Sequence, residues 1–331
     1  MPENRSSRGN TRRPEGEDSG VGIHALLLVR DEADVLPQVL SHLLEWCASI
    51  HVYDTGSTDG TWEIVHDFAG RERRVQPFLR EAIANDLSLR GRMFERLQSG
   101  FRRGDWIMRA DADEFYVESP ETWLRERVRG CEGRVCTQQY EFVFTTRDLE
   151  AWERGEESVA DRSRPICSRR RRFYVEPEAE LRFCRYRPGM RWGQGHNLPF
   201  NPGHVAQERI GVRHYRWRDP PQMDARCRLR AACAKVTHHG PHWSIADWRR
   251  WVFDDADPRL HTWTPGTPLP ARRGLEHLGP PSRRLAQRVM YASGLPSLLD
   301  RFRPTWSDGP PPAPFRFEMP GITPTPIDSA L

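Results

Sequence analysis

The stretch RADADEFY (109–116) places two aspartates, Asp111 and Asp113, one residue apart, directly after the apolar run DWIM (105–108). Two carboxylates at the end of a buried strand repel each other and lose hydration, so a cation or hydrogen bonds must compensate them. Hard divalent ions such as Mg²⁺ and Mn²⁺ prefer oxygen ligands. The pair therefore favours a metal site over a solvated loop.

Strand and helix patterns alternate upstream of this pair. Buried strands are predicted at 22–29, 49–54, 74–79 and 105–110, and helices with apolar residues at helical spacing at 33–47, 61–69 and 86–101. This βαβαβαβ order predicts an α/β fold, with a mostly parallel sheet flanked by helices.

Polar clusters follow three of these strands. They are Arg30, Asp31 and Glu32 after the first strand, DTGSTDG (54–60) after the second, and Asp111 with Asp113 after the fourth. Ligands of open parallel sheets bind at the carboxyl ends of the strands, so three such clusters indicate one site. Carboxylates such as Asp54 suit base or ribose groups, and the Gly, Ser and Thr turn offers backbone N–H groups. Taken alone, that turn is equally well explained as a capped helix start.

Two segments, LLLVRDEADVLPQVLSHLLEWCASIHVYDTGSTDGTWEI (26–64) and WIMRADADEF (106–115), resemble family-2-type glycosyltransferases of the GT-A fold. That family usually carries V-R-N-E after strand one, then a D-x-G-S-x-D-G-T turn and a D-x-D motif; Asp31 stands where Asn is usual. The segment VRHYRWRDPPQMDARCRLR (212–230) resembles an H-Y-x-x-R-[SD]-P-x-Q-M element of bacterial members.

The resemblance implies a metal-dependent glycosyltransferase that moves a sugar from a nucleotide sugar to an acceptor that the sequence does not identify. It implies nucleotide binding by Arg30, Asp31, Glu32, Asp54, Ser57, Asp59, Asp111 and Arg218, and binding of Mn²⁺ or Mg²⁺ by Asp111, Asp113 and His214. No signature marks the catalytic base. Candidates are Glu176, Glu178 and Glu180 in an acidic run, and His196 in a glycine-rich loop.

Other functions stay open at this point. A nucleotidyltransferase or a D-x-D phosphohydrolase would also use paired aspartates, although a dehalogenase-type phosphatase carries its pair after the first strand and not the fourth. A sugar-nucleotide or glycan-binding module without turnover would keep the same fold.

Composition divides the chain of 331 residues into four parts. The predictions are a disordered polar arm (1–20), a GT-A-like catalytic domain (21–236), a helical extension (237–302) and a proline-rich tail (303–331). In the less regular second half, strands are expected at 133–144 and 181–187 and helices at 220–236 and 282–302. The last helix is basic and amphipathic, which favours a packed surface helix, with peripheral membrane contact as the alternative.

Charge, hydropathy and cysteine content argue against a nucleic-acid-binding, membrane-spanning or secreted protein. The net charge is +4 with a single lysine, Lys235, and acidic residues nearly balance the arginines. The run SRRRRFY (168–174) is the one basic patch considered, so no nucleic-acid partner is predicted. No apolar stretch is long enough for a transmembrane segment or a secretory signal. Seven cysteines without a C-x-x-C pair predict reduced thiols in a cytoplasmic protein.

The histidines of HHGPHW (238–243) are a second candidate metal site. A zinc site requires three or four convergent ligands, which His238, His239 and His242 could provide. A helix-end cap with aromatic packing is the favoured interpretation.

Overall fold

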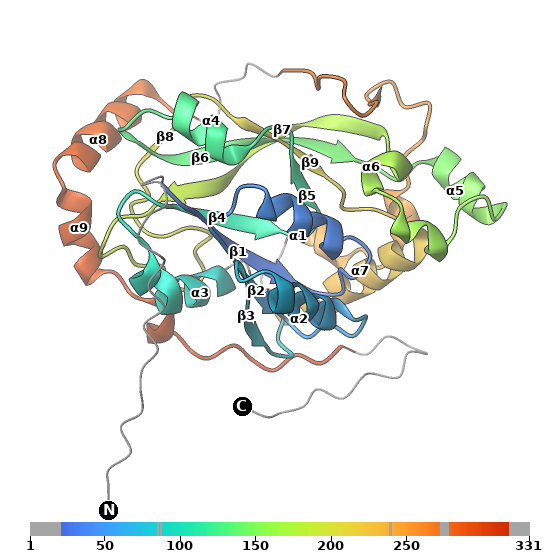
Figure 1. Cartoon of the computed structure of the whole chain (residues 1–331), viewed down its shortest axis with the longest axis horizontal. Helices are drawn as coiled ribbons and strands as arrows, with labels where there is room; N and C mark the ends of the chain where they lie inside the picture. The colour runs from blue at the N-terminus through green and yellow to red at the C-terminus, as the bar shows by residue number, and fades with distance from the viewer. Residues whose placement is uncertain (1–20, 85, 87, 238–239, 272–277, 318–331) are drawn as a thin grey trace, which may run out of the picture.

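The structure is a computed structural model that describes residues 21–84, 86, 88–237, 240–271 and 278–317 (Figure 1). The predicted arm at 1–20 lies outside the described residues.

One mixed sheet forms the centre of the described chain (Figure 1). Its strands are β1 (Ile23–Val29), β2 (Ser49–Asp54), β3 (Val75–Arg80), β4 (Trp106–Asp111), β5 (Glu114–Tyr116), β6 (Glu132–Phe142), β7 (Arg172–Arg185), β8 (His204–Val205), β9 (Ile210–His214) and β10 (His261–Thr262). The order is β3-β2-β1-β4-β7-β6-β9-β5, with β8 paired to β6 and β10 to β7. Strands β1 to β4 pair in parallel, whereas β4–β7, β7–β6 and β9–β5 are antiparallel. The predicted α/β fold, with a mostly parallel sheet flanked by helices, is confirmed.

Helices connect and cover these strands. They are α1 (Leu36–Leu44), α2 (Thr61–Arg71), α3 (Leu89–Leu97), α4 (Pro120–Arg127), α5 (Thr146–Glu153), α6 (Ile166–Arg169), α7 (Pro220–Cys233), α8 (Pro281–Ala292) and α9 (Leu295–Leu299). Short 3₁₀ turns cover Gln98–Gly100, Val159–Ser163, Pro241–Ser244, Trp248–Trp251, Asp300–Phe302 and Trp306–Asp308. In the described residues, no helix is both long and apolar enough to cross a bilayer.

The central strand β1 is apolar on both faces because each face is covered. Leu27 packs in the core formed with α1 and α2, and Leu26 packs in a second core formed with α3. Alternate side chains of a strand point to opposite faces, so one apolar run serves two layers. The helices cover the two faces of the sheet, so the carboxyl ends of the central strands β1 and β4 stay accessible.

Two expected elements differ from the structure. The single helix predicted at 282–302 is divided into α8 and α9 at Gly294, whose φ of 72° is in the left-handed region and ends α8. The strand predicted at 181–187 begins earlier in the structure, at Arg172. The prediction was too short because charged residues interrupt the apolar alternation in the first part of this strand.

The described parts of the predicted extension and tail contact the sheet domain. Strand β10 pairs with β7, and Trp306 is buried in the core beside α3. The backbone N–H of Phe315 donates to the carbonyl of Ala82 at 2.7 Å. The segment from 303 to 317 therefore packs on the domain despite its prolines.

We expect Leu26→Ala and Leu27→Ala each to lower the free energy of unfolding by about 2–5 kcal/mol, since both side chains are fully buried in different layers. Urea unfolding would measure the loss. The control Leu285→Ala, on a side chain that is 64% exposed, should change it by less than about 0.5 kcal/mol. A neutral result at Leu26 would mean that the α3 face is not packed.

Candidate functional site

A cavity of about 570 Å³ opens at the carboxyl ends of β1 and β4, with α7 as its opposite wall. All three predicted clusters contribute to it. Its polar lining consists of Arg30, Asp31, Glu32, Asp34, Thr58, Asp59, Arg90, Asp111, Asp113, Arg162, Glu180, Arg182, His214, Arg216, Gln222, Asp224, Arg226, Arg230 and His242. The site therefore holds many charges of both signs in one enclosed space.

Asp111 lies at the end of β4 between two guanidinium groups. Arg90 from α3 and Arg182 from β7, the latter at 2.7 Å, both pair with its carboxylate. Arg90 is fully buried and also donates from Nε to the carbonyl of Leu26 at 3.1 Å, which fixes its direction. Burial alone would raise the pKa of Asp111, but Arg182 and Arg90 outweigh it and hold that pKa below its ordinary value.

Asp113 is held in a chain of buried charges. The His214 Nε2 lies 3.2 Å from its Oδ1, and the His214 Nδ1 lies 2.7 Å from Glu141 Oε1. Burial would lower the pKa of His214, but Glu141 and Asp113 outweigh it and raise that pKa to about 10. The imidazole is thus a cation between two anions at neutral pH.

Strand pairing brings these groups together. The D-x-D motif runs into β5, which pairs with β9 and sets Glu114 opposite His214. Strand β9 also pairs with β6, which sets His214 opposite Glu141. The contact expected between Asp113 and His214 is present, although no local pattern pointed to Glu141.

Residues far away in the chain hold the first cluster in place. Arg218 is fully buried and pairs with Glu32 and Asp34, both at 2.6 Å. Arg226 bridges Glu32 at 3.1 Å and Asp113 at 3.0 Å. Burial, opposed by Arg218 and Arg226, raises the pKa of Glu32 to about 7. Arg218 itself does not line the cavity; it supports the carboxylates that do.

The turn after β2 supplies structure as well as cavity wall. Asp54 is fully buried and accepts from the backbone N–H groups of Gly56 and Ser57, both at 2.7 Å. Neither Asp54 nor Ser57 lines the cavity, whereas Asp31 and Asp59 do. Asp31 has φ of 54°, a region that Asp and Asn tolerate best, and its Oδ1 accepts from the N–H of Thr58 at 2.7 Å.

Only one of the four candidate bases lines the cavity. Glu180 does, with its side chain 38% exposed and hydrogen-bonded to Gln139 at 2.9 Å. Burial would raise its pKa, but Arg182 and Arg109 outweigh it, so that pKa lies below its ordinary value. Glu176, Glu178 and His196 are not part of the lining.

The described side chains do not fit a divalent metal in their present arrangement. Asp111 is paired with two arginines, and Asp113 with His214 and Arg226. Across the described residues, no group of three or more His, Cys, Asp or Glu is arranged to hold a metal ion. A cation could reach these oxygens only after guanidinium groups had moved away, so the metal role of Asp111, Asp113 and His214 stays a prediction.

Several cavity residues were missed from the sequence. Arg226 and Arg230 follow Gln222 at intervals of four along α7, which is the spacing of one helix face. Glu141 does not line the cavity, and its place within the predicted strand at 133–144 gave no sign of its pairing with His214. Arg90 and Arg182 gave no local signal, because their partners lie on elements far away in the sequence.

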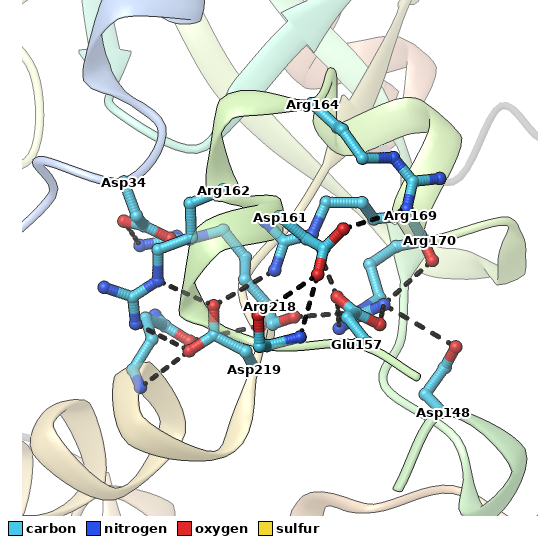
Figure 2. A network of polar contacts seen from close by, with 12 residues as sticks. Asp34, Asp148, Glu157, Asp161, Arg162, Arg164, Arg169, Arg170, Arg218 and Asp219 are labelled. Carbon is cyan, nitrogen blue, oxygen red and sulfur yellow. Dashed lines mark hydrogen bonds and ion pairs between the residues drawn. The ribbon is translucent and has the colours of Figure 1, made fainter. Parts of the chain in front are cut away.

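Two arginines of the run at 169–172, Arg169 and Arg170, are part of an internal network that supports the start of α7 (Figure 2). Arg169 and Arg170 are buried and pair with Glu157 at 2.9 Å. Asp219, the N-cap of α7, accepts from Arg162 at 2.7 Å and from Arg169 at 3.1 Å. These two arginines of the predicted basic patch are thus neutralised inside the domain.

Of the three histidines considered as zinc ligands, His238 and His239 lie outside the described residues. His242 lines the cavity from the 3₁₀ turn Pro241–Ser244.

Neither known family models nor curated proteins match the chain. Among solved structures, it is similar to the mannosyltransferase PcManGT from Pyrobaculum calidifontis in complex with GDP-Man and Mn²⁺, at 14% identity and a TM-score of 0.36, over 70% of this chain and 68% of that one. It is also similar to GalNAc-T7 with UDP, GalNAc and Mn²⁺, at 10% identity and a TM-score of 0.34, over 71% of this chain and 55% of that one. Likenesses this weak assign no activity.

The His214 ion pairs predict a pH-dependent stability. Because folding raises the pKa of His214 from about 6.5 to about 10, the stabilisation is complete below the first value and is lost as the pH rises through the second. His214→Gln should cost about 3 kcal/mol near neutral pH and clearly less near pH 10, as measured by urea unfolding.

His51→Gln is the matched control. His51 is also buried, but burial, followed by the charge of His24, lowers its pKa to about 4, so it is neutral throughout this range. The cost of His51→Gln should therefore not change with pH. An equal cost of His214→Gln at both pH values would exclude the imidazolium.

Proposed function

We propose that the protein is a glycosyltransferase that moves a sugar from a nucleotide-sugar donor to a hydroxyl of an acceptor, with the 570 Å³ cavity as the donor site. One observation carries the proposal: three acidic strand-end clusters and the basic face of α7 meet in a single cavity at the carboxyl ends of parallel strands. The volume is in the range of small-molecule sites, about 300–1,000 Å³. The resemblance of the strand-end motifs to family-2-type glycosyltransferases supports the same function.

The diphosphate of the donor fits the α7 wall. Arg230 has no carboxylate partner among the described residues, and its guanidinium instead lies over the rings of Trp217 at 5.7 Å and Trp243 at 4.6 Å. Burial and then the charges of Arg226 and Arg216 lower the pKa of Arg230 to about 9, so it stays a cation at neutral pH. A half-buried cation without an ion-pair partner favours an anionic ligand.

The nucleoside fits the opposite wall. Asp31, Glu32 and Asp59 present carboxylates there, which can accept hydrogen bonds from ribose hydroxyls or base N–H groups. Asp54 acts through the turn, since it fixes the backbone N–H groups of Gly56 and Ser57.

Transfer requires a proton acceptor for the attacking hydroxyl. As the acceptor oxygen forms a bond to the anomeric carbon, the bond from that carbon to the diphosphate breaks and its electrons leave with the phosphate oxygen. We assign the hydroxyl proton to Glu180, because it is the one of the four candidate bases that lines the cavity. The arginines of the cavity stabilise the negative charge that develops on the diphosphate.

The aspartates of the D-x-D motif are already paired with cationic side chains, so the proposed reaction relies on the arginines and not on a metal. The predicted Mn²⁺ or Mg²⁺ would have to displace Arg226 from Asp113 and the arginines from Asp111 before binding.

We expect UDP or GDP to bind the protein and Arg230→Gln to weaken that binding about tenfold or more, the size of one charge-assisted hydrogen bond. Titration calorimetry would measure both. Arg228→Gln is the matched control, because Arg228 lies on the same helix but outside the cavity lining and pairs with Asp224 at 2.8 Å. Equal affinity of the two variants would contradict the role of Arg230.

The same titration shows whether the arginines of the cavity or an added metal ion provide the positive charge that binds the nucleotide. We expect nucleotide binding to persist in EDTA, because the guanidinium groups are already in place. Binding that appears only after Mn²⁺ or Mg²⁺ is added would instead support the metal ligands predicted from the sequence.

Glu180→Gln should leave donor binding unchanged and reduce transfer at least about a hundredfold, the usual loss for a general base. Release of nucleoside diphosphate from a panel of nucleotide sugars, with candidate acceptors, would measure transfer. Glu178→Gln is the control, since Glu178 is an exposed carboxylate of the same strand outside the cavity. Equal activity of both variants would exclude Glu180 as the base.

The same assay addresses the rival functions. A sugar-nucleotide-binding module would bind nucleotide without any release. A nucleotidyltransferase or phosphohydrolase would form products other than a free nucleoside diphosphate and a transferred sugar.

A further inference from the structure

Exposed apolar side chains are concentrated in one short segment. Ten large apolar residues of the described chain are exposed, and six of them lie between 285 and 302: Leu285, Val289, Leu295, Leu298, Leu299 and Phe302. Their exposed fractions reach 64% at Leu285 and 82% at Phe302. Exposed apolar side chains concentrated in this way point to an interaction site.

Helix α8 turns its apolar residues outward. Its inner side carries Gln287, which accepts from Arg134 at 3.3 Å, and Tyr291, which packs against the backbone at Gly133 and Gly203. Leu285 and Val289, four residues apart, share the outer side. The sequence favoured a packed surface helix, but the large apolar side of this helix is the one that is not packed.

Buried polar contacts hold the following segment in this orientation. Asp300 is fully buried, pairs with Arg187 and accepts from Asn201 Nδ2 at 2.6 Å. Pro296 is also buried. Because these contacts fix both ends of α9, Leu298 and Leu299 cannot turn inward without breaking a buried ion pair.

The same surface is basic. Residues 281 to 303 contain five arginines, of which Arg288, Arg301 and Arg303 are exposed. Arg283 is exposed too, but it lies beside Gln287 and Tyr291 on the inner side of α8. The only acidic residue in this range is Asp300, which is buried and already paired. In Figure 1, α8 and α9 form the outer edge of the molecule, away from α7.

We propose that the outer side of α8 and α9 binds an anionic membrane surface, with Leu285, Val289, Leu298 and Phe302 in the headgroup–acyl boundary and Arg288, Arg301 and Arg303 on lipid phosphates. Apolar area together with basic charge is the combination that interfacial helices use. A second copy of the chain fits less well, because a symmetric contact would bring the arginine clusters of both copies together. No residue of this surface lines the cavity, so the proposal is independent of the transferase activity.

Vesicle co-sedimentation of the full chain tests the proposal. We expect binding at low salt to phosphatidylcholine vesicles that contain about one third phosphatidylglycerol, weaker binding as salt is added, and little binding to phosphatidylcholine alone. The double variant Leu285→Glu with Val289→Glu should lower the partition coefficient about tenfold or more. Its melting temperature should match that of the wild type, since both side chains are more than 60% exposed.

Val159→Glu is the matched control, because Val159 is 49% exposed on a different part of the surface, and it should bind vesicles as the wild type does. Equal loss of binding in Val159→Glu and in the double variant would overturn the proposal. So would the absence of wild-type binding to anionic vesicles. Sedimentation velocity gives a further criterion: a dimer that the double variant dissociates would show that a second copy covers this surface instead.

Discussion

The structure of the site depends on the need to compensate buried carboxylates. Asp111, Asp113 and Glu141 are each largely removed from water and stay ionised, so each must lie against a cation. Arg90, Arg182, His214 and Arg226 provide those cations, and they come from four different elements. Electrostatic compensation therefore ties α3, β7, β9 and α7 to the carboxyl ends of the parallel strands.

The same ion pairs also explain why a cavity remains open between the carboxylates. An arginine that bridges two carboxylates, as Arg226 does between Glu32 and Asp113, fixes the distance between the first and third clusters. Arg218 also pairs with two carboxylates, Glu32 and Asp34, which both follow β1. The carboxylates are held apart by cations that are themselves held by packing, which leaves a polar space between them. Arg230 completes the wall without a carboxylate of its own.

A different balance applies at the edge of the molecule. The polar residues of α8 and the buried Asp300 fix the segment to the domain, so the apolar residues are left on the outside. The sequence could not reveal this, because an amphipathic pattern states that a helix has two faces but not which one is packed. The direction was decided by the partners of Gln287, Tyr291 and Asp300, which lie between 88 and 158 residues away in the chain.

The sequence by itself determined the parallel half of the sheet and the position of the site, because the signals for both are local. Apolar runs at strand length, helical spacing between them and charges at three strand ends specify where β1, β2 and β4 end. The contact of His214 with Asp113 was also within reach, through the H-Y-x-x-R element. Only the tertiary structure decided which groups neutralise the aspartates, that Asp54 and Arg218 support the cavity rather than line it, and that α8 faces outward. The reason is physical: the pairing of a buried charge is set by which distant helices and strands the fold brings beside it, and no local pattern records that neighbour.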